Sequence, residues 1–225
     1  MALPSFKDSQ LLITALSHRS SLNEKTASGT TAVESNERLE FLGDAVLELA
    51  VTEYLFAEFP AEPEGKLTAY RSALVKTTTL AELAKDLGLG EQMYMSKGEE
   101  ATGGRNNESL LADTTEAVIG ALYLDQGYKA VVTFLTANLY PKFTEILKNK
   151  LYKDHKSLLQ EVVQAKGLPT PAYEVVKEVG PDHDKEFTVV VTVAEVAKGT
   201  GVGKNKQQAQ QQAALEALKE FGELS

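Results

Sequence analysis

Residues 36–49 read NERLEFLGDAVLEL, and this stretch predicts a helix whose acidic face borders its apolar side. Glu37, Glu40 and Asp44 recur at helical spacing, so they share one face. The residues around them are mainly Leu, Phe, Ala and Val, which form a stripe that is expected to be buried. A carboxylate held near buried apolar packing costs free energy unless a partner charge or a metal compensates it.

A second stretch repeats this pattern further along the chain, where residues 110–120 read LLADTTEAVIG. Asp113 and Glu116 share one helical face, and the stretch contains no basic residue. Several carboxylates that are brought together repel one another, and divalent cations relieve this repulsion. Hard cations such as magnesium bind oxygen ligands and act on phosphate esters, often in pairs.

A solvated helix face is the alternative interpretation, and it is the commoner explanation of any single pair of acids on a helix. Three features favour a functional cluster instead. Arg38 is the only basic residue in the first stretch, so a series of i, i+4 ion pairs that would neutralise the acids along the helix is not expected there. Gly43 lies inside a helical run, where glycine costs about 1 kcal/mol relative to alanine, which indicates close packing. The acidic pattern also occurs twice.

The two motifs resemble the signature sequences of the bacterial ribonuclease III family, which are endonucleases specific for double-stranded RNA. Residues 37–45, ERLEFLGDA, are similar to the first signature, and residues 111–117, LADTTEA, match the second. The resemblance implies a homodimer with two magnesium-dependent centres, in which manganese can substitute. It implies two catalytic residues, Asp44 and Glu116, and four metal ligands: Glu40, Asp44, Asp113 and Glu116.

The resemblance also implies roles for side chains around this centre. Glu37 and Glu64 match positions that the family uses around the RNA, and Phe41 would plug a pocket on the partner subunit. Core packing is the competing interpretation of Phe41, and we interpret His18 as structural. One metal ion would generate the attacking hydroxide, and the other would stabilise charge on the leaving 3′-oxygen. The products would carry 5′-phosphate and 3′-hydroxyl ends, in the processing of ribosomal and messenger RNA precursors.

The first part of the chain, residues 1–150, predicts helices throughout, and we interpret it as an all-α catalytic and dimerisation domain. Asn36 is expected to cap the first acidic helix, and Asn106 or Asn107 the second. The other expectations are helices at 11–17, 66–76, 78–87 and 128–148, a loop at 98–107, and a helix end at Gly127.

Residues 154–225 predict a small α+β domain with the order helix, three antiparallel strands, helix (α-β-β-β-α). This order is similar to a double-stranded-RNA-binding domain, which reads RNA by its shape across two minor grooves. The expected elements are a helix at 155–166, strands at 173–179, 186–193 and 195–200, a glycine-rich turn at 199–203, and a helix at 204–221.

Charge is the unusual feature of this second domain. The whole chain has a net charge of −9, and residues 154–225 hold eight lysines against eleven Asp and Glu residues, a net −3. Gln207 stands where the family pattern prefers a second basic residue, so we expect weaker RNA affinity and a flatter salt dependence. The RNA contacts that the resemblance predicts are Gln160, Glu161, His183, Lys204 and Lys206.

Composition excludes several other classes of protein. The chain has no cysteine, which excludes disulfides and cysteine-ligated metals and fits a reducing cytoplasm. Residues 1–8 lack the pattern of a signal peptide, and no stretch approaches the ~20 apolar residues of a membrane span, so we expect a cytoplasmic protein without membrane contact. No phosphate-binding loop motif occurs, so no nucleotide cofactor is expected. No Glu-x-x-His pair occurs, which argues against a di-iron bundle.

Two functions from other classes stay open. One is a protein that binds double-stranded RNA and uses its helical domain only for dimerisation, although all four acids are present. The other is a metal-dependent phosphohydrolase that acts on small phosphate esters. The C-terminal domain argues against the second function, and a nucleotide substrate would separate it from RNA cleavage.

Overall fold

The computed structural model describes residues 3–22, 34–148, 150–152, 154–181 and 185–224. The chain forms two compact units, Met1–Ile146 and Leu147–Ser225, and each has its own hydrophobic core. The domain boundaries at 150 and 154 stay predictions. Within the described ranges, no helix is both long and apolar enough to cross a membrane.

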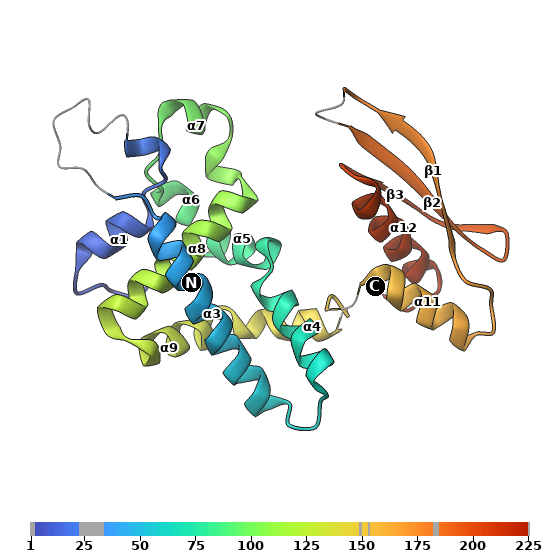
Figure 1. Ribbon diagram of the computed structural model, residues 1–225, viewed down its shortest axis with the longest axis horizontal. Coiled ribbons are helices and arrows are strands. Elements are labelled where there is room, and N and C mark those ends of the chain that lie inside the picture. Colours follow the sequence, from blue (N-terminus) through green and yellow to red (C-terminus); the bar gives the residue numbers. More distant parts are fainter. Residues whose placement is uncertain (1–2, 23–33, 149, 153, 182–184, 225) are drawn as a thin grey trace. The chain divides into compact units, whose positions relative to one another are not determined.

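The N-terminal unit is helical, as predicted (Figure 1). Its central helix is α8, which packs against α1, α3, α5 and α9 and buries ten of its 19 residues, so the acids on α8 emerge from a buried scaffold. The elements are α1 (Ser9–Ala15), α3 (Glu37–Glu58), α4 (Glu64–Val75), α5 (Thr77–Asp86), α6 (Leu89–Gln92), α7 (Lys97–Ala101), η1 (Gly104–Asn106), α8 (Glu108–Gln126), α9 (Tyr128–Asn138), η2 (Tyr140–Lys142) and α10 (Phe143–Lys148).

The loop predicted at 98–107 is wrong, because α7 and η1 occupy most of it. Ser96 caps α7 by accepting a hydrogen bond from the backbone N–H of Glu99. The guanidinium of Arg105 donates to the carbonyl oxygens of Gly90 and Met93 at 2.8 and 3.0 Å. These contacts order a polar stretch that lacks the apolar periodicity of a helix.

The single helix predicted at 128–148 is also wrong. Helix α9 ends at Asn138, η2 follows with Pro141 in its first turn, and α10 begins at Phe143. Proline has no N–H to donate, and its ring clashes with the preceding turn, so the helix is interrupted there.

The two asparagines that were expected to cap the acidic helices behave differently. Asn36 precedes α3, but its side chain makes no capping hydrogen bond, so that expectation is wrong. The side chain of Asn107 accepts the N–H groups of Ser109 and Leu110 and caps α8, as predicted. Gly127 ends α8, also as predicted.

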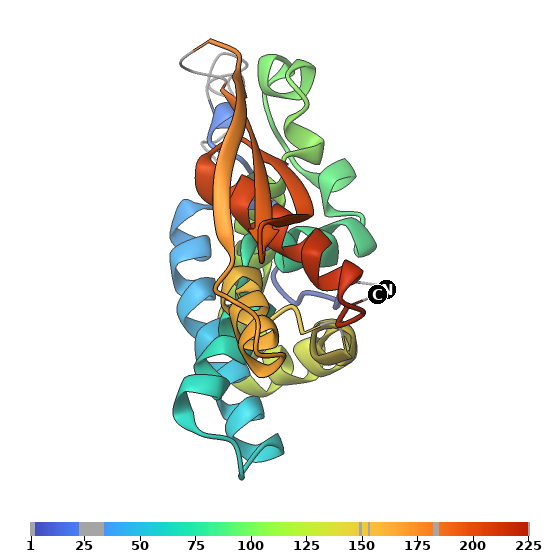
Figure 2. The ribbon, with the colours of Figure 1, turned by 90° about the vertical axis from the view of Figure 1, so that its right-hand side faces the viewer.

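The C-terminal unit has the predicted order of helix, three antiparallel strands and helix (Figure 1, Figure 2). The strand order is β1-β2-β3, and α12 packs along β2 and β3 and against α11. Val189, Val191 and Val193 alternate along β2 and fill the core. The elements are α11 (His155–Ala165), β1 (Ala172–Val179), β2 (Glu186–Val193), β3 (Val196–Gly203) and α12 (Lys206–Glu220).

The predicted glycine-rich turn is wrong, because its residues belong to β3. Gly199 and Gly201 face α12, and a Cβ built on either would overlap backbone atoms of that helix. Glycine therefore lets the strand and the helix reach backbone contact. Helix α12 begins at Lys206 after its cap, Asn205, so Lys204 precedes the helix instead of lying within it.

Candidate active centre

A contact between α3 and α8 positions the acids, and two glycines make this contact. A Cβ built on Gly43 would overlap the carbonyl oxygen of Glu116, and one built on Gly120 would overlap the carbonyl oxygen of Leu39. The two helices therefore touch backbone to backbone, closer than a side chain would permit. Glu40 lies one turn before Gly43, so this contact brings it beside the acids of α8.

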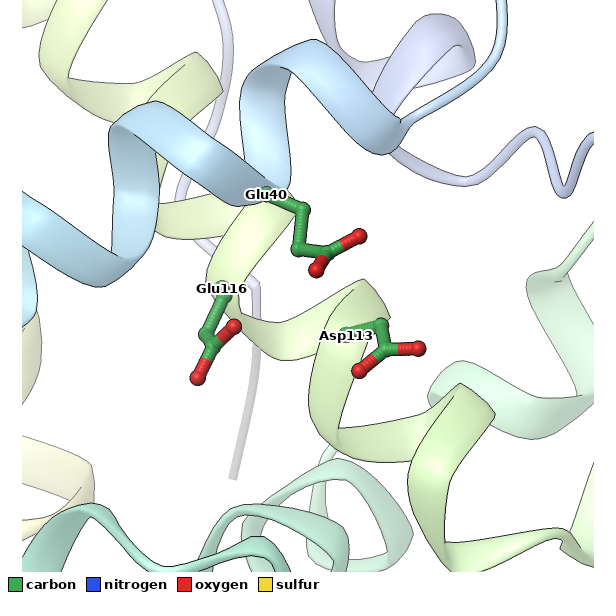
Figure 3. Close-up of side chains that lie close together, drawn as sticks. All are labelled: Glu40, Asp113 and Glu116. Carbon is green, nitrogen blue, oxygen red and sulfur yellow. The ribbon is translucent and has the colours of Figure 1, made fainter.

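Three carboxylates converge at this crossing: Glu40 from α3, and Asp113 and Glu116 from α8 (Figure 3). One oxygen from each carboxylate lies within 4.8 Å of the other two. All three residues are half-buried. A set of carboxylate oxygens at this spacing matches the ligand preference of hard divalent cations.

Burial is the largest cause of the raised pKa of each of these three carboxyl groups. For Glu116, burial is followed by repulsion from neighbouring acids, Asp44 foremost, and together they raise its pKa from 4.5 to about 8. Repulsion from neighbouring acids also adds to the effect of burial on the pKa of Glu40. The metal-free site therefore retains a proton at neutral pH, which a bound cation would displace.

Asp44, the fourth predicted ligand, is not a member of this group of three. It lies one turn beyond Glu40 on α3, and it is exposed. Its charge raises the pKa of both Glu40 and Glu116, so it borders the same site. The metal-ligand roles of Asp44 and of the other three acids stay predictions.

A hollow of about 220 Å³ opens beside two of the clustered carboxylates, Glu40 and Asp113. Glu37 also lines it, next to the cluster, and forms an exposed ion pair with Arg19 at 3.6 Å. The sequence interpretation missed His18 and Arg19 as members of this site, because no spacing rule links their turn to α8. The residues around the hollow are His18, Arg19, Asn36, Glu37, Glu40, Leu110 and Asp113.

Glu64 lies away from the carboxylates of its own chain. It begins α4 and lines a separate groove of about 410 Å³ with Phe56 and Arg71. Its carboxylate accepts a hydrogen bond from the Thr68 hydroxyl at 3.1 Å. One chain therefore does not bring Glu64 into the cluster.

Phe41 lies on the surface, 82% exposed, so packing in the core of its own chain does not explain it. It lines a hollow of about 660 Å³ together with Leu11, Leu42 and Leu124. A large exposed aromatic side chain beside an apolar hollow is typical of an interface.

The predicted RNA contacts that the structure describes lie on the surface of the C-terminal unit. Gln160 and Glu161 are exposed on α11, and Lys204 and Lys206 are exposed where α12 begins. His183 lies outside the described residues.

Both units match known protein families. Residues 8–143 match a family described as Ribonuclease-III-like, and residues 155–221 match the double-stranded RNA binding motif. The chain is 48% identical over 218 residues to proteins named Ribonuclease 3 from Bacillus cereus (strain G9842) and Bacillus anthracis (strain CDC 684 / NRRL 3495). These alignments cover 97% of this chain and 87% of each relative. The chain belongs to the ribonuclease III family.

Solved structures of this family resemble the N-terminal unit. The nuclease domain of ribonuclease III from Campylobacter jejuni has a TM-score of 0.55 and 42% identity, over 62% of this chain and 88% of that one. A second structure of that domain is described as showing structural flexibility in a region involved in dimer formation. Its TM-score is 0.53 and its identity 44%, over 59% of this chain and 87% of that one.

Membership of the ribonuclease III family confirms the resemblance inferred from the two motifs, as well as the predicted fold class. The chain is a double-stranded-RNA-specific endoribonuclease, and its family implies a divalent metal.

Proposed function

We propose that the chain cleaves double-stranded RNA with magnesium held by Glu40, Asp44, Asp113 and Glu116, and that Asp44 and Glu116 are the catalytic pair. The observation that carries this proposal is the convergence of three half-buried carboxylates where two glycines join α3 to α8. A divalent cation would offset both their mutual repulsion and the cost of their burial. Oxygen ligands favour magnesium, and manganese accepts the same donors.

The side chains of the cluster have two tasks in this reaction. They must be deprotonated to bind a cation, so Glu116, with a pKa of about 8, gives up its proton when metal binds. They must also be held in place, and the contact between α3 and α8 fixes their backbone positions. When bound, magnesium supplies the Lewis acidity that activates water and offsets charge on the leaving oxygen. The products carry a 5′-phosphate and a 3′-hydroxyl.

The active form in this proposal is a homodimer in which Phe41 of each subunit enters an apolar pocket of the other. The exposure of Phe41 and the apolar hollow beside it support this arrangement. Two centres related by the dimer axis would cut both strands and leave short 3′ overhangs. Glu37 and Glu64 would lie along the RNA near each cut.

The C-terminal unit would hold the duplex while the N-terminal unit cuts it. Its match to the double-stranded RNA binding motif supports this division of labour. The substrates would be structured precursors of ribosomal and messenger RNA in the cytoplasm. The contacts to RNA would come from Gln160, Glu161, His183, Lys204 and Lys206.

Incubation of the full chain with a long RNA duplex tests this proposal. We expect short duplexes with 5′-phosphates in magnesium, the same products in manganese, and no cleavage in EDTA. A DNA duplex of the same sequence and a nucleotide phosphate ester are the control substrates. Hydrolysis of the ester without cleavage of the duplex would favour the small-ester phosphohydrolase instead. Tight duplex binding without cleavage in either metal would favour a dimerisation scaffold.

A further inference from the structure

The turn that carries His18 is fixed from two directions. The backbone N–H of His18 donates to the carbonyl oxygen of Tyr94 at 2.9 Å. On the other side, the N–H of Asn36 donates to the carbonyl oxygen of Ser17 at 2.9 Å. The turn is therefore tied both to the segment before α7 and to the start of α3, the helix that carries Glu40. The position of the His18 ring beside the carboxylate cluster follows from these contacts.

The hydrogen bonds of Ser20 determine which ring nitrogen of His18 carries the proton. Ser20 Oγ lies 2.8 Å from His18 Nδ1, and the Ser20 N–H donates to the same nitrogen at 3.4 Å. Ser20 Oγ also accepts the N–H of Ser96 at 3.0 Å, so its own proton can point toward Nδ1. Nδ1 is therefore an acceptor, and the proton of the neutral ring resides on Nε2.

The ring can offer this Nε2–H to the hollow that His18 lines together with Glu40 and Asp113. Glu40 and Asp113 are the two clustered carboxyl groups that line this hollow with His18. The proximity of His18 opposes the rise that burial causes in the pKa of Asp113. The pKa of Glu40 and that of Glu116 respond instead to neighbouring acids. Asp113 is therefore the clustered carboxyl group that both shares the hollow with His18 and has its pKa affected by His18.

We propose that His18 is a positioning residue whose Nε2–H donates to a carboxylate oxygen of Asp113 and so orients that ligand toward a divalent cation. This inference rests on the proposed function, because it takes Asp113 as a metal ligand. A carboxylate with one oxygen held by a donor cannot rotate away from the metal. Loss of such a partner typically lowers metal affinity or activity about 10- to 100-fold.

The competing explanation is that His18 serves only the turn, through Nδ1 and Ser20. Two substitutions separate these roles. His18→Asn keeps the turn, because its side-chain oxygen accepts the N–H two residues on, but it has no donor at the position of Nε2. His18→Gln extends an N–H donor toward the position of Nε2 but lacks the acceptor at Nδ1.

Binding of Mn²⁺ to the full chain without RNA, measured by electron paramagnetic resonance at pH 8, is the main readout. We expect His18→Asn to weaken Mn²⁺ binding about 10- to 100-fold and His18→Gln to bind close to the wild-type level. The opposite order would overturn the proposal in favour of the turn. Normal Mn²⁺ binding by both variants together with weakened binding of duplex RNA in EDTA would assign His18 to the RNA and also overturn it.

The wild-type chain offers a check that needs no variant. Long-range ¹H–¹⁵N spectra of the metal-free protein should show the His18 proton on Nε2, and a proton on Nδ1 would overturn the proposal. Failure of the wild-type chain itself to bind Mn²⁺ would instead contradict the proposed function. The two failures are therefore distinguishable.

Discussion

The two units of this chain use the same device, a pair of glycines at a backbone contact, with different results. In the N-terminal unit, Gly43 and Gly120 join two helices, and half-buried acids surround the contact. In the C-terminal unit, Gly199 and Gly201 join a strand to a helix, and the alanines of α12 fill the core there. A close backbone contact is therefore not sufficient to make a site. The contact between α3 and α8 makes a site because it brings several carboxyl groups together, and burial raises the pKa of each of the three that cluster there.

The functional groups of the two units also differ in how firmly they are held. The three clustered carboxylates of the N-terminal unit are half-buried and fixed by the helix crossing. By contrast, Lys204 and Lys206 of the C-terminal unit are exposed, and residues 154–225 have a net charge of −3. A change in the first set should abolish the reaction. A change in the second set should weaken RNA binding by degrees.

The largest effect is expected from Glu116→Gln, which removes a charge without changing the shape of the side chain. Cleavage in magnesium should fall about 10³-fold or more, because a bound metal contributes several kcal/mol to the transition state. Single-turnover cleavage measures this loss, and RNA affinity in EDTA should stay unchanged. The matched control is Glu108→Gln, since Glu108 lies on α8 in an exposed ion pair with Lys85 and should tolerate the change. Near-normal cutting by Glu116→Gln would remove Glu116 from the centre.

The next effect concerns the glycines themselves. Gly43→Ala should push α3 away from α8, at a cost of about 1–3 kcal/mol or more in the free energy of unfolding, and should weaken Mn²⁺ binding. Gly65→Ala is the matched control, because Gly65 is also helical and nothing lies within 4 Å of its added Cβ. This control should stabilise the chain by about 0.5–1 kcal/mol.

Gly201→Ala tests whether the glycine contact of the C-terminal unit has any effect on the metal site. It should lower the stability of the C-terminal unit and the affinity for RNA, while Mn²⁺ binding stays normal. For Gly43→Ala, Gly65→Ala and Gly201→Ala, chemical denaturation measures the stability and Mn²⁺ titration measures the metal affinity. Wild-type Mn²⁺ affinity in Gly43→Ala would mean that the helix crossing does not assemble the site.

A smaller effect follows from the raised pKa of Glu116. Because this pKa rises from 4.5 to about 8, the folded chain keeps a proton between these pH values that the unfolded chain has lost. The stability of the metal-free protein should therefore fall as the pH rises from about 5 to 8. Glu116→Gln should flatten this slope and exceed the wild-type Tm at pH 8 by roughly 2–4 °C, the shift that 1 kcal/mol gives in a chain of this size. Thermal melts in EDTA measure the Tm across this pH range. Equal slopes of Tm against pH for the wild type and Glu116→Gln would contradict the raised pKa of Glu116.

The smallest effect is expected from Lys204→Gln combined with Lys206→Gln. Each lost phosphate contact should reduce the slope of log affinity against log salt by about 1, and cleavage at low salt should persist. Fluorescence anisotropy of a labelled duplex across a salt series measures the slope. Lys198→Gln is the control, because Lys198 is ion-paired with Glu220. An unchanged slope in the double variant would remove these lysines from the RNA-binding surface.

Short-range spacing was enough to predict most of the fold and to identify the acidic faces from which Glu40, Asp113 and Glu116 come together. The acids of α3 and α8 share helical faces by local periodicity, and both helices form with those faces near one another. The order of the C-terminal unit follows from strand alternation and turn residues in the same way. These features depend on residues a few positions apart, which a sequence displays directly.

Features that depend on tertiary contacts could not be predicted in this way. Gly199 and Gly201 looked like a turn, but they pair with β2 as part of a strand, and α12 packs directly against their backbone. His18 was interpreted as structural, because it comes to line the hollow with Asp113 only once its turn is tied to Tyr94 and Asn36. In each case the deciding neighbour is distant in sequence.

The central claim is that the clustered carboxylates bind a divalent cation, and the protons released on binding test it most directly. Calorimetry of Mg²⁺ binding in buffers with different ionisation enthalpies counts these protons. With a pKa of about 8 at Glu116, the wild-type chain should release about one proton at pH 7, and Glu116→Gln should release far less. Binding without proton release, or with equal release by both proteins, would contradict a metal centre at these carboxylates.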